Sequence, residues 1–506
     1  MEPYSIDEVL RNTAGAGPEL ILCATAVLVI ALDWFLSPRQ SRAGAGAFAL
    51  IGTLGALMVA LDRNDAGGTV SFLFRDMLIY DGLSAMFRIF FLAATIVGIV
   101  FALRAESLKG RRMGEYYAAM LTATLGMIWL AAAADWMMFY IALETLSLPS
   151  YALAGYLRTD RRSSEAALKY VLYGGVASAM LLFGVSYLYG LSGTLEMSRA
   201  FQNAQAGLHA HAVALILVLC GLLFKIAAVP FQFWAPDVYQ GAPTPVTAWL
   251  SVASKAAGFA ALLRVFAPFI TEAETVGPVA SLISLPWLFW ILSAFTMTFG
   301  NLAAIKQTDL KRLFAYSSIA HAGYLLMALA IFDSADAIRA LLFYLLIYFV
   351  MNYGAFYCIL VIENRTGRTD IAAFRGILAL DSSARVSPIL VVAMIACLLS
   401  LTGLPVLAGF IAKFLLFGAL IERGSALTVS LALIGVLNSV ISLYYYFRIA
   451  RAMTLEKADA AVGVGDYRIP AFDRAVLWGV SVALVWLFIA WSGLLRIAEA
   501  GRMIGS

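Results

Sequence analysis

Charged residues are scarce in this sequence. Only 13% of its 506 residues are Asp, Glu, Lys or Arg, and 62% are hydrophobic, whereas soluble domains usually carry about 25% charged residues. The shortage excludes an ordinary soluble protein and indicates an integral membrane chain. We also expect no cleavable signal, because residues 1–18 are polar and contain Glu2, Asp7 and Glu8 instead of a basic stretch before a short apolar core.

Cysteine and histidine are few as well. The four cysteines each stand alone inside an apolar run: Cys23, Cys220, Cys358 and Cys397. This spacing fits no zinc or iron–sulfur pattern, so we interpret them as small buried apolar residues. The three histidines are His209, His211 and His321. Their spacing offers no metal site either, and we expect no cofactor, metal or electron-transfer centre in this chain.

Long apolar runs are abundant. Fourteen of them approach the roughly 20 residues that a helix needs to cross a bilayer. They cover residues 19–36, 43–61, 83–103, 116–134, 136–156, 166–191, 211–230, 245–269, 287–305, 310–330, 338–362, 388–420, 428–447 and 475–495. The longest loops run only about 25 residues, which leaves no room for a soluble domain. The sequence therefore predicts an all-α polytopic membrane protein with about fourteen transmembrane helices.

Basic residues gather in alternate loops. The odd-numbered loops, counted with Lys311 and Arg312 at the very start of the tenth span, hold 21 Lys and Arg residues, whereas the termini and the even-numbered loops hold 8. Cytoplasmic loops carry the excess of Lys and Arg in membrane proteins. Both termini are therefore predicted on the non-cytoplasmic side, which is the periplasm if the chain lies in a bacterial inner membrane.

A few charges lie inside the spans. Glu144 is eight residues into the fifth span, about 12 Å deep at 1.5 Å per residue. Lys225 precedes Pro230 in the seventh span, Lys255 is deep in the eighth, and Lys413 follows a break in the twelfth. A buried charge costs about 2.5–3.5 kcal/mol at the centre of a membrane helix. Ionisable residues at this depth indicate an ion or proton pathway by default.

Two spans are interrupted at corresponding places. Pro230 breaks the seventh span, and Gly403, Pro405 and Gly409 break the twelfth. The two are an odd number of spans apart and so cross in opposite directions, which is the pattern of inverted-topology repeats. We expect spans 1–3 in residues 1–115, two inverted five-helix repeats in 116–270 and 287–453, and span 14 in 454–506.

Simpler interpretations stay open for several of these residues. Arg88 and Arg264 lie near span ends, where long basic side chains often reach out to the headgroups. Glu144 is either part of a pathway or only a counter-ion for a buried lysine. His321, inside the tenth span, is either a pathway residue or a packing histidine.

Four stretches resemble a known family. They are FKIAAVPFQFWAPDVYQGAPTPV, the SKAAG that follows, QTDLKRLFAYSSIAHAGY and LTGLPVLAGFIAKF. They are similar to the antiporter-like subunits of proton-pumping NADH:quinone oxidoreductase, respiratory complex I. Within this family the chain looks most like the bacterial N subunits, because it stops after the fourteenth span and carries Lys413 where the M subunits are expected to have a glutamate.

The resemblance implies a role for each buried residue. Glu144 matches the glutamate that pairs with the seventh-span lysine, and Lys225 matches that lysine, the switching proton carrier. Lys255 matches the lysine that passes protons between the repeats, Lys413 the residue connected to the external side, and His321 a position on the hydrated axis. Desolvation disfavours the charged form of Lys225 and a nearby carboxylate restores it, so movement of Glu144 would toggle the lysine between holding and releasing a proton.

The same resemblance implies partners. Flavin mononucleotide, iron–sulfur clusters and quinone are expected in other subunits of the complex, which would supply the energy for pumping. The neighbours would be another antiporter-like subunit and the small subunits toward the quinone site, with the lipid bilayer around them and no nucleic acid. The competing functions are a cation/proton exchange subunit of a multisubunit Mrp-type antiporter and an inert membrane scaffold.

Overall fold

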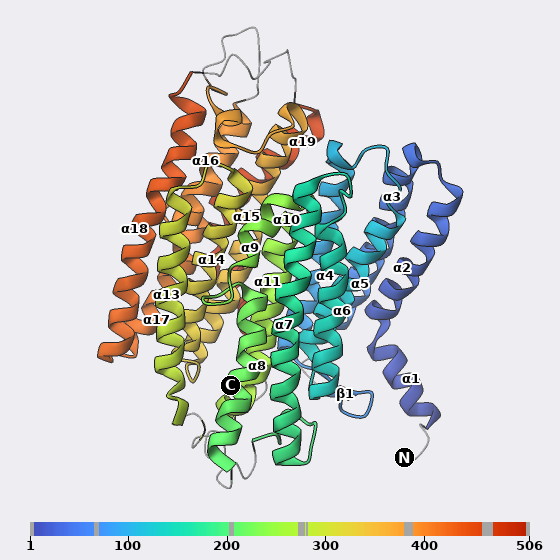
Figure 1. Cartoon of the computed structure of the whole chain (residues 1–506), viewed down its shortest axis with the longest axis vertical. Helices are drawn as coiled ribbons and strands as arrows, with labels where there is room; N and C mark the ends of the chain where they lie inside the picture. The colour runs from blue at the N-terminus through green and yellow to red at the C-terminus, as the bar shows by residue number, and fades with distance from the viewer. Residues whose placement is uncertain are drawn as a thin grey trace.

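The computed structural model shows a bundle of long, roughly parallel helices (Figure 1). It describes residues 5–64, 70–201, 207–271, 279, 282–378, 388–457 and 469–501. The chain termini, whose side of the membrane the basic loops predict, lie outside these residues. Within the described part the fold is almost entirely α-helical, as expected from the sequence.

The elements follow one another in a simple order. The first part of the chain forms α1 (Ile6–Gly15), α2 (Gly17–Phe35), α3 (Pro38–Asn64), β1 (Ser71–Leu73), β2 (Leu78–Tyr80), α4 (Gly82–Arg104), η1 (Glu106–Leu108), α5 (Gly114–Ala132), α6 (Trp136–Ala154) and α7 (Arg161–Ser192). The middle forms α8 (Leu208–Ile226), α9 (Trp234–Gly241), α10 (Thr244–Trp249), η3 (Leu250–Ser254) and α11 (Lys255–Thr271). The last part forms α13 (Leu285–Ile305), α14 (Leu310–Leu329), α15 (Ala335–Thr366), η4 (Ile371–Phe374), α16 (Ile389–Thr402), α17 (Ala408–Glu422), α18 (Ala426–Thr454), α19 (Ala471–Ile489) and α20 (Trp491–Ala500).

Eleven helices of the described part are long and apolar enough to cross a membrane. The helices α5 and α14, with 19 and 20 residues, run alongside them, and α16 with α17 forms an interrupted pair. This arrangement is compatible with the predicted fourteen crossings. Several helices extend past the apolar runs, such as α7 and α15 with 32 residues each, because helical hydrogen bonding continues into the polar flanks where hydropathy ends.

The segment from α10 to α11 lies at the centre of the molecule. Its most apolar window is completely buried inside the chain's own fold, and Figure 1 shows it between the later helices on one side and the earlier helices on the other. A π-helical turn, η3, joins α10 to α11 immediately before Lys255. Such turns are rare in proteins, and those that occur often lie at functional sites.

Both predicted breaks are present. The helix α8 ends at Ile226, and Ala227 takes a left-handed conformation with φ of 58° before the chain continues to α9. The helix α16 ends at Thr402, followed by Gly403 with φ of 84°. Pro230 and Pro405 each lack the N–H that would continue a helical ladder. Since α8 and α16 are an odd number of crossings apart, they run in opposite directions (Figure 1).

The idea that Arg88 and Arg264 reach the headgroups is wrong for this fold. Both are buried, at 4% and 6% exposure. The Arg264 guanidinium donates to both carboxylate oxygens of Asp81 at 2.6 Å, and Arg88 contacts Glu19 at 2.7 Å. Each arginine has its counter-ion on a helix or strand end far away in sequence, so ion pairing replaces solvation by the interface.

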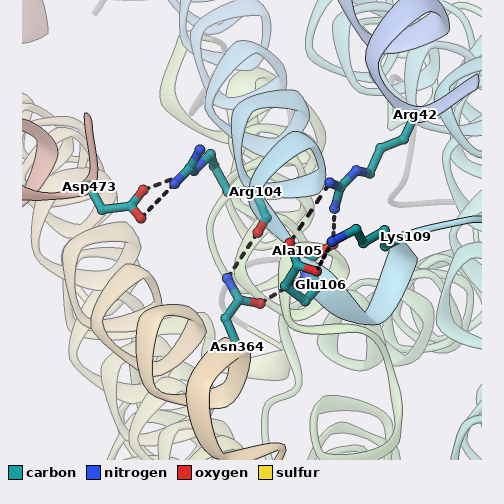
Figure 2. A network of polar contacts seen from close by, with 7 residues as sticks. All are labelled: Arg42, Arg104, Ala105, Glu106, Lys109, Asn364 and Asp473. Atoms are coloured by element: carbon teal, nitrogen blue, oxygen red, sulfur yellow. Dashed lines mark hydrogen bonds and ion pairs between the residues drawn. The ribbon is translucent and has the colours of Figure 1, made fainter. Parts of the chain in front are cut away.

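A polar network ties the beginning of the chain to its end (Figure 2). Arg104, the last residue of α4, donates to both oxygens of Asp473 on α19, at 2.9 and 2.7 Å. Asn364 of α15 donates to the carbonyl of Arg104 and accepts from the backbone N–H of Glu106, both at 2.9 Å. Bidentate arginine–carboxylate contacts fix orientation as well as distance. The third and fourteenth spans are therefore held together beside α15.

Candidate functional site

Four of the five predicted site residues are deeply buried. Lys225 on α8, Lys255 on α11, Lys413 on α17 and His321 on α14 are between 2% and 4% exposed. Glu144 on α6 is half-buried. The site thus draws one residue from each of five helices, and four of its ionisable side chains lie away from the surface of the chain.

Lys225 lies one residue before the end of α8. Its ammonium group donates to the hydroxyl oxygen of Ser147 on α6 at 3.0 Å. The carbonyl of Phe224, freed by the helix end, accepts a hydrogen bond at 3.0 Å from the indole N–H of Trp234 on α9. Broken helices at membrane depth persist only where such freed backbone groups find partners.

Glu144 lies three residues before Ser147 on the same face of α6. Its Oε1 atom is buried and has no hydrogen-bond partner among the described residues, and none of their ion pairs within 4.0 Å includes it. The direct contact with Lys225 that the resemblance implies is absent from this conformation, and Ser147 occupies the position next to the ammonium group. An unpaired buried carboxylate oxygen is costly and is a common feature of functional sites.

Lys255 bridges two helices with its side chain. The ammonium group donates to the carbonyl of Ile226, the last residue of α8, at 3.2 Å, and to the carbonyl of Ser318 on α14 at 2.6 Å. Ile226 is the residue that follows Lys225 in the sequence. Lys225 and Lys255 therefore lie on either side of the end of α8, linked through Ile226.

Lys413 occupies the same kind of position at the second break. Its ammonium group donates to the carbonyl of Thr402, the last residue of α16, at 2.8 Å, and to the hydroxyl of Ser439 on α18 at 3.0 Å. It also lies 4.4 Å from the ring centre of Tyr324, a cation–π contact. A side chain at Gly403 would collide with the lysine, since its Cβ would lie 2.7 Å from Lys413 Cδ.

The two helix breaks share one type of hydrogen bond. In each, a lysine ammonium binds the carbonyl of the final helical residue, Ile226 for α8 and Thr402 for α16. Helix C-termini carry a partial negative charge and unsatisfied carbonyls. These carbonyls can stabilise a protonated lysine without a full counter-charge.

His321 lies between the lysine sites. Its Nδ1 atom is 2.8 Å from the hydroxyl of Tyr344, and its Nε2 atom is 3.5 Å from the hydroxyl of Tyr446. Ser318, three residues earlier on α14, accepts through its hydroxyl from Tyr348 at 3.0 Å, while its carbonyl accepts from Lys255. The region between Lys255 and His321 is thus lined by hydroxyl groups, which can both donate and accept a proton.

Sequence reasoning missed the hydroxyl residues and one charged cluster. Ser147, Ser318 and Ser439 carried no signal, because single serines are common in membrane helices. Asp237 on α9 lies between Lys169 and Arg312 within the recognised PDVYQGAPTPV stretch. The only sign of its role in the sequence is that residues 231–244 contain this carboxylate but no Lys or Arg. A cation from another part of the chain must therefore balance the negative charge of Asp237.

Comparison with known proteins decides the family. Residues 133–442 match the model for the transmembrane region shared by NADH:quinone oxidoreductase and Mrp antiporters. The chain belongs to this family. The match covers both helix breaks and all five candidate site residues, so the resemblance expected from the sequence is confirmed.

Individual relatives are similar to this chain over nearly its full length. The chain is 40% identical to the NADH-quinone oxidoreductase subunit N of Anaeromyxobacter, over 99% of this chain and 98% of that one. Among solved structures, it is similar to a chain of respiratory complex I from Thermus thermophilus with 33% identity and a TM-score of 0.77, covering 96% of this chain and all of that one. A chain of the Mrp complex from Dietzia has a TM-score of 0.79 at 23% identity, covering 96% of each chain, and shares the fold.

Proposed function

We propose that this chain is the proton-translocating N-type subunit of an NADH:quinone oxidoreductase. The observation that carries the proposal is the series of buried lysines at the two helix breaks, in a chain 40% identical to an N subunit over nearly its full length. The Mrp-type alternative is supported only by likeness of fold. An inert scaffold leaves the buried lysines without a purpose.

The proposed mechanism uses the chain's own side chains. Lys225 takes a proton next to Ser147 and passes it toward Lys255 across the end of α8. The hydroxyl-lined region around His321 leads on toward Lys413, which faces the outlet. Moving each charge outward against the membrane potential costs about 2.3 kcal/mol per 100 mV. We propose that Glu144 provides the control, by moving toward Lys225 to favour its protonated form and away to release the proton.

The energy would come from partner subunits. We propose that flavin mononucleotide, iron–sulfur clusters and the quinone site reside in them, and that residues 116–270 and 287–453 act as two inverted units. The neighbours would be a second antiporter-like subunit and the small membrane subunits toward the quinone site.

Co-purification tests the proposal. A tagged chain isolated from its native membrane in mild detergent should carry flavin and iron–sulfur absorbance and should oxidise NADH with a quinone acceptor. The matched control is an untagged strain taken through the same purification. Isolation together with only small membrane subunits, free of flavin and iron, would contradict the proposal and favour the antiporter.

The chain's orientation gives a separate expected result. We propose a bacterial inner-membrane location with both termini in the periplasm, on the basis of the 21 to 8 distribution of basic residues. An alkaline phosphatase reporter fused after Ser506 should be active, and a cytoplasm-dependent fluorescent reporter at the same position should be dark. The reverse pattern would show an odd number of crossings or an inverted chain.

A further inference from the structure

The short helix α9 is held between the two halves of the chain by one carboxylate. Asp237 Oδ2 accepts from the ammonium of Lys169 on α7 at 2.6 Å, and its Oδ1 accepts from the guanidinium of Arg312 on α14. Arg312 also donates to Gln240 on α9 at 3.2 Å. The helix α7 belongs to the first proposed repeat and α14 to the second, so Asp237 joins the two units.

The same helix contacts both proton-carrying lysine positions. At its start, Trp234 donates to the carbonyl of Phe224, the residue before Lys225. Toward its end, the hydroxyl of Tyr239 lies 3.4 Å from that of Ser318, whose carbonyl holds Lys255. A displacement of α9 would therefore shift the surroundings of both lysines together.

The helix α9 has little intrinsic tendency to form by itself. It has only eight residues, no side-chain cap at its start and Pro236 within its first turn. Isolated helices shorter than roughly 12–15 residues are marginal even in water. Besides the bridge, α9 is anchored by the Trp234 indole, stacked on Tyr170 with ring centres 4.4 Å apart, and by its packing between α7 and α14. At its end, the Thr247 hydroxyl donates to the carbonyl of Tyr239 at 3.0 Å, and the Lys311 ammonium donates to the carbonyl of Ala242 at 2.8 Å. Asp237 differs from these anchors because it binds α7 and α14 at once.

We propose that Asp237 is a positioning residue for proton transfer. By binding Lys169 and Arg312, it fixes the position of α9. Trp234 and Tyr239 on α9 then hold the backbone groups around Lys225 and Lys255 at the correct distance from each other. The inference rests on the proposed function, since it assigns Asp237 a task in the same pathway. It differs from a simple stabilising role because its loss should impair transfer in a complex that is still assembled.

The test uses the complete complex reconstituted in proteoliposomes. Asp237→Ala should lower NADH-driven proton pumping per assembled complex by about tenfold, because small misplacements of reacting groups can cost that much or more. Asp237→Glu should retain at least half of the pumping. The matched control is Glu165→Ala, which removes a half-exposed carboxylate from the same lysine, bound at 2.7 Å, and should pump normally.

Hydrogen exchange measured by mass spectrometry provides a second readout. In Asp237→Ala, faster exchange should be confined to the peptide spanning residues 231–243. Faster exchange spread over α7 and α14 would indicate general destabilisation and overturn the proposal, as would normal pumping by Asp237→Ala or equal damage in Asp237→Glu. If Asp237→Ala fails to assemble, Lys169→Gln should pump about threefold more slowly by the same misplacement, and normal pumping there would overturn the proposal.

The outcome separates this inference from the proposed function. If Lys225→Ala abolishes pumping while Asp237→Ala leaves it intact, only the positioning role fails. If Lys225→Ala also pumps normally, the pathway itself is wrong, and the role of Asp237 fails with it.

Discussion

Replacement of Lys225 by alanine should leave the complex assembled and lower NADH-driven proton pumping by about tenfold or more, since a positioned proton-transfer group commonly contributes 10²–10⁴-fold. The ammonium group donates to Ser147, and a serine hydroxyl alone cannot hold the transferred charge. Fluorescence quenching of a ΔpH dye in inverted vesicles measures the pumping, and native gels measure assembly. Normal pumping would remove Lys225 from the pathway.

Two further variants sharpen this result. Lys225→Arg keeps the positive charge but should also pump poorly, because arginine effectively never deprotonates in proteins. The control is Lys109→Ala, which removes a lysine whose side chain is 67% exposed and binds Glu106 at the surface. It should pump at the normal rate, which would show that loss of a lysine charge is not in itself harmful.

The second large effect concerns Glu144 and Lys225 together. In a structural ion pair, removal of one partner costs about 3–5 kcal/mol and removal of both is often neutral. Among the ion pairs within 4.0 Å in the described residues, none joins Glu144 to Lys225, and Lys225 donates to Ser147 instead. We therefore expect Glu144→Leu, Lys225→Leu and the double variant to assemble to similar extents, and all three to lose pumping.

A double-mutant cycle measures this coupling. Assembly and redox-driven acidification are scored separately, and the coupling in assembly should be well below about 1 kcal/mol, a typical lower range for contacting residues. Recovery of both assembly and pumping in the double variant would show that Glu144 is only a counter-ion. Recovery of pumping cannot occur if the lysine carries the proton, because no titratable group replaces it.

The fold was largely predictable, because long apolar runs leave few alternatives in a membrane. The breaks at Pro230 and at Gly403 were also visible, since proline and glycine act through local backbone geometry. The hairpin of β1 with β2 and the helix α1 were not predicted. Residues 71–80 are too short and mixed in polarity to signal a strand pair, and α1 depends on a capping box between Ser5 and Glu8.

The site was only partly predictable. Lys225, Lys255 and Lys413 could be identified because each is a charged residue inside an apolar run. Burial of a charge in a membrane span is costly, so such residues are usually functional. Their partners could not be inferred, since the carbonyls of Ile226 and Thr402 become available only when the helices end where they do. The partners of the three lysines lie on other helices, between 11 and 78 residues away along the sequence, and the pattern of apolar runs does not fix which helices meet.

The contact of Arg104 with Asp473 has a consequence for biosynthesis. The two residues are 369 positions apart, so at the usual 5–20 residues per second about 20–70 s of translation separate them. Throughout that interval Arg104 lacks the carboxylate with which it pairs in the folded chain. The contact can form only after Asp473 has been synthesised, so α4 is fixed to α19 late in biosynthesis.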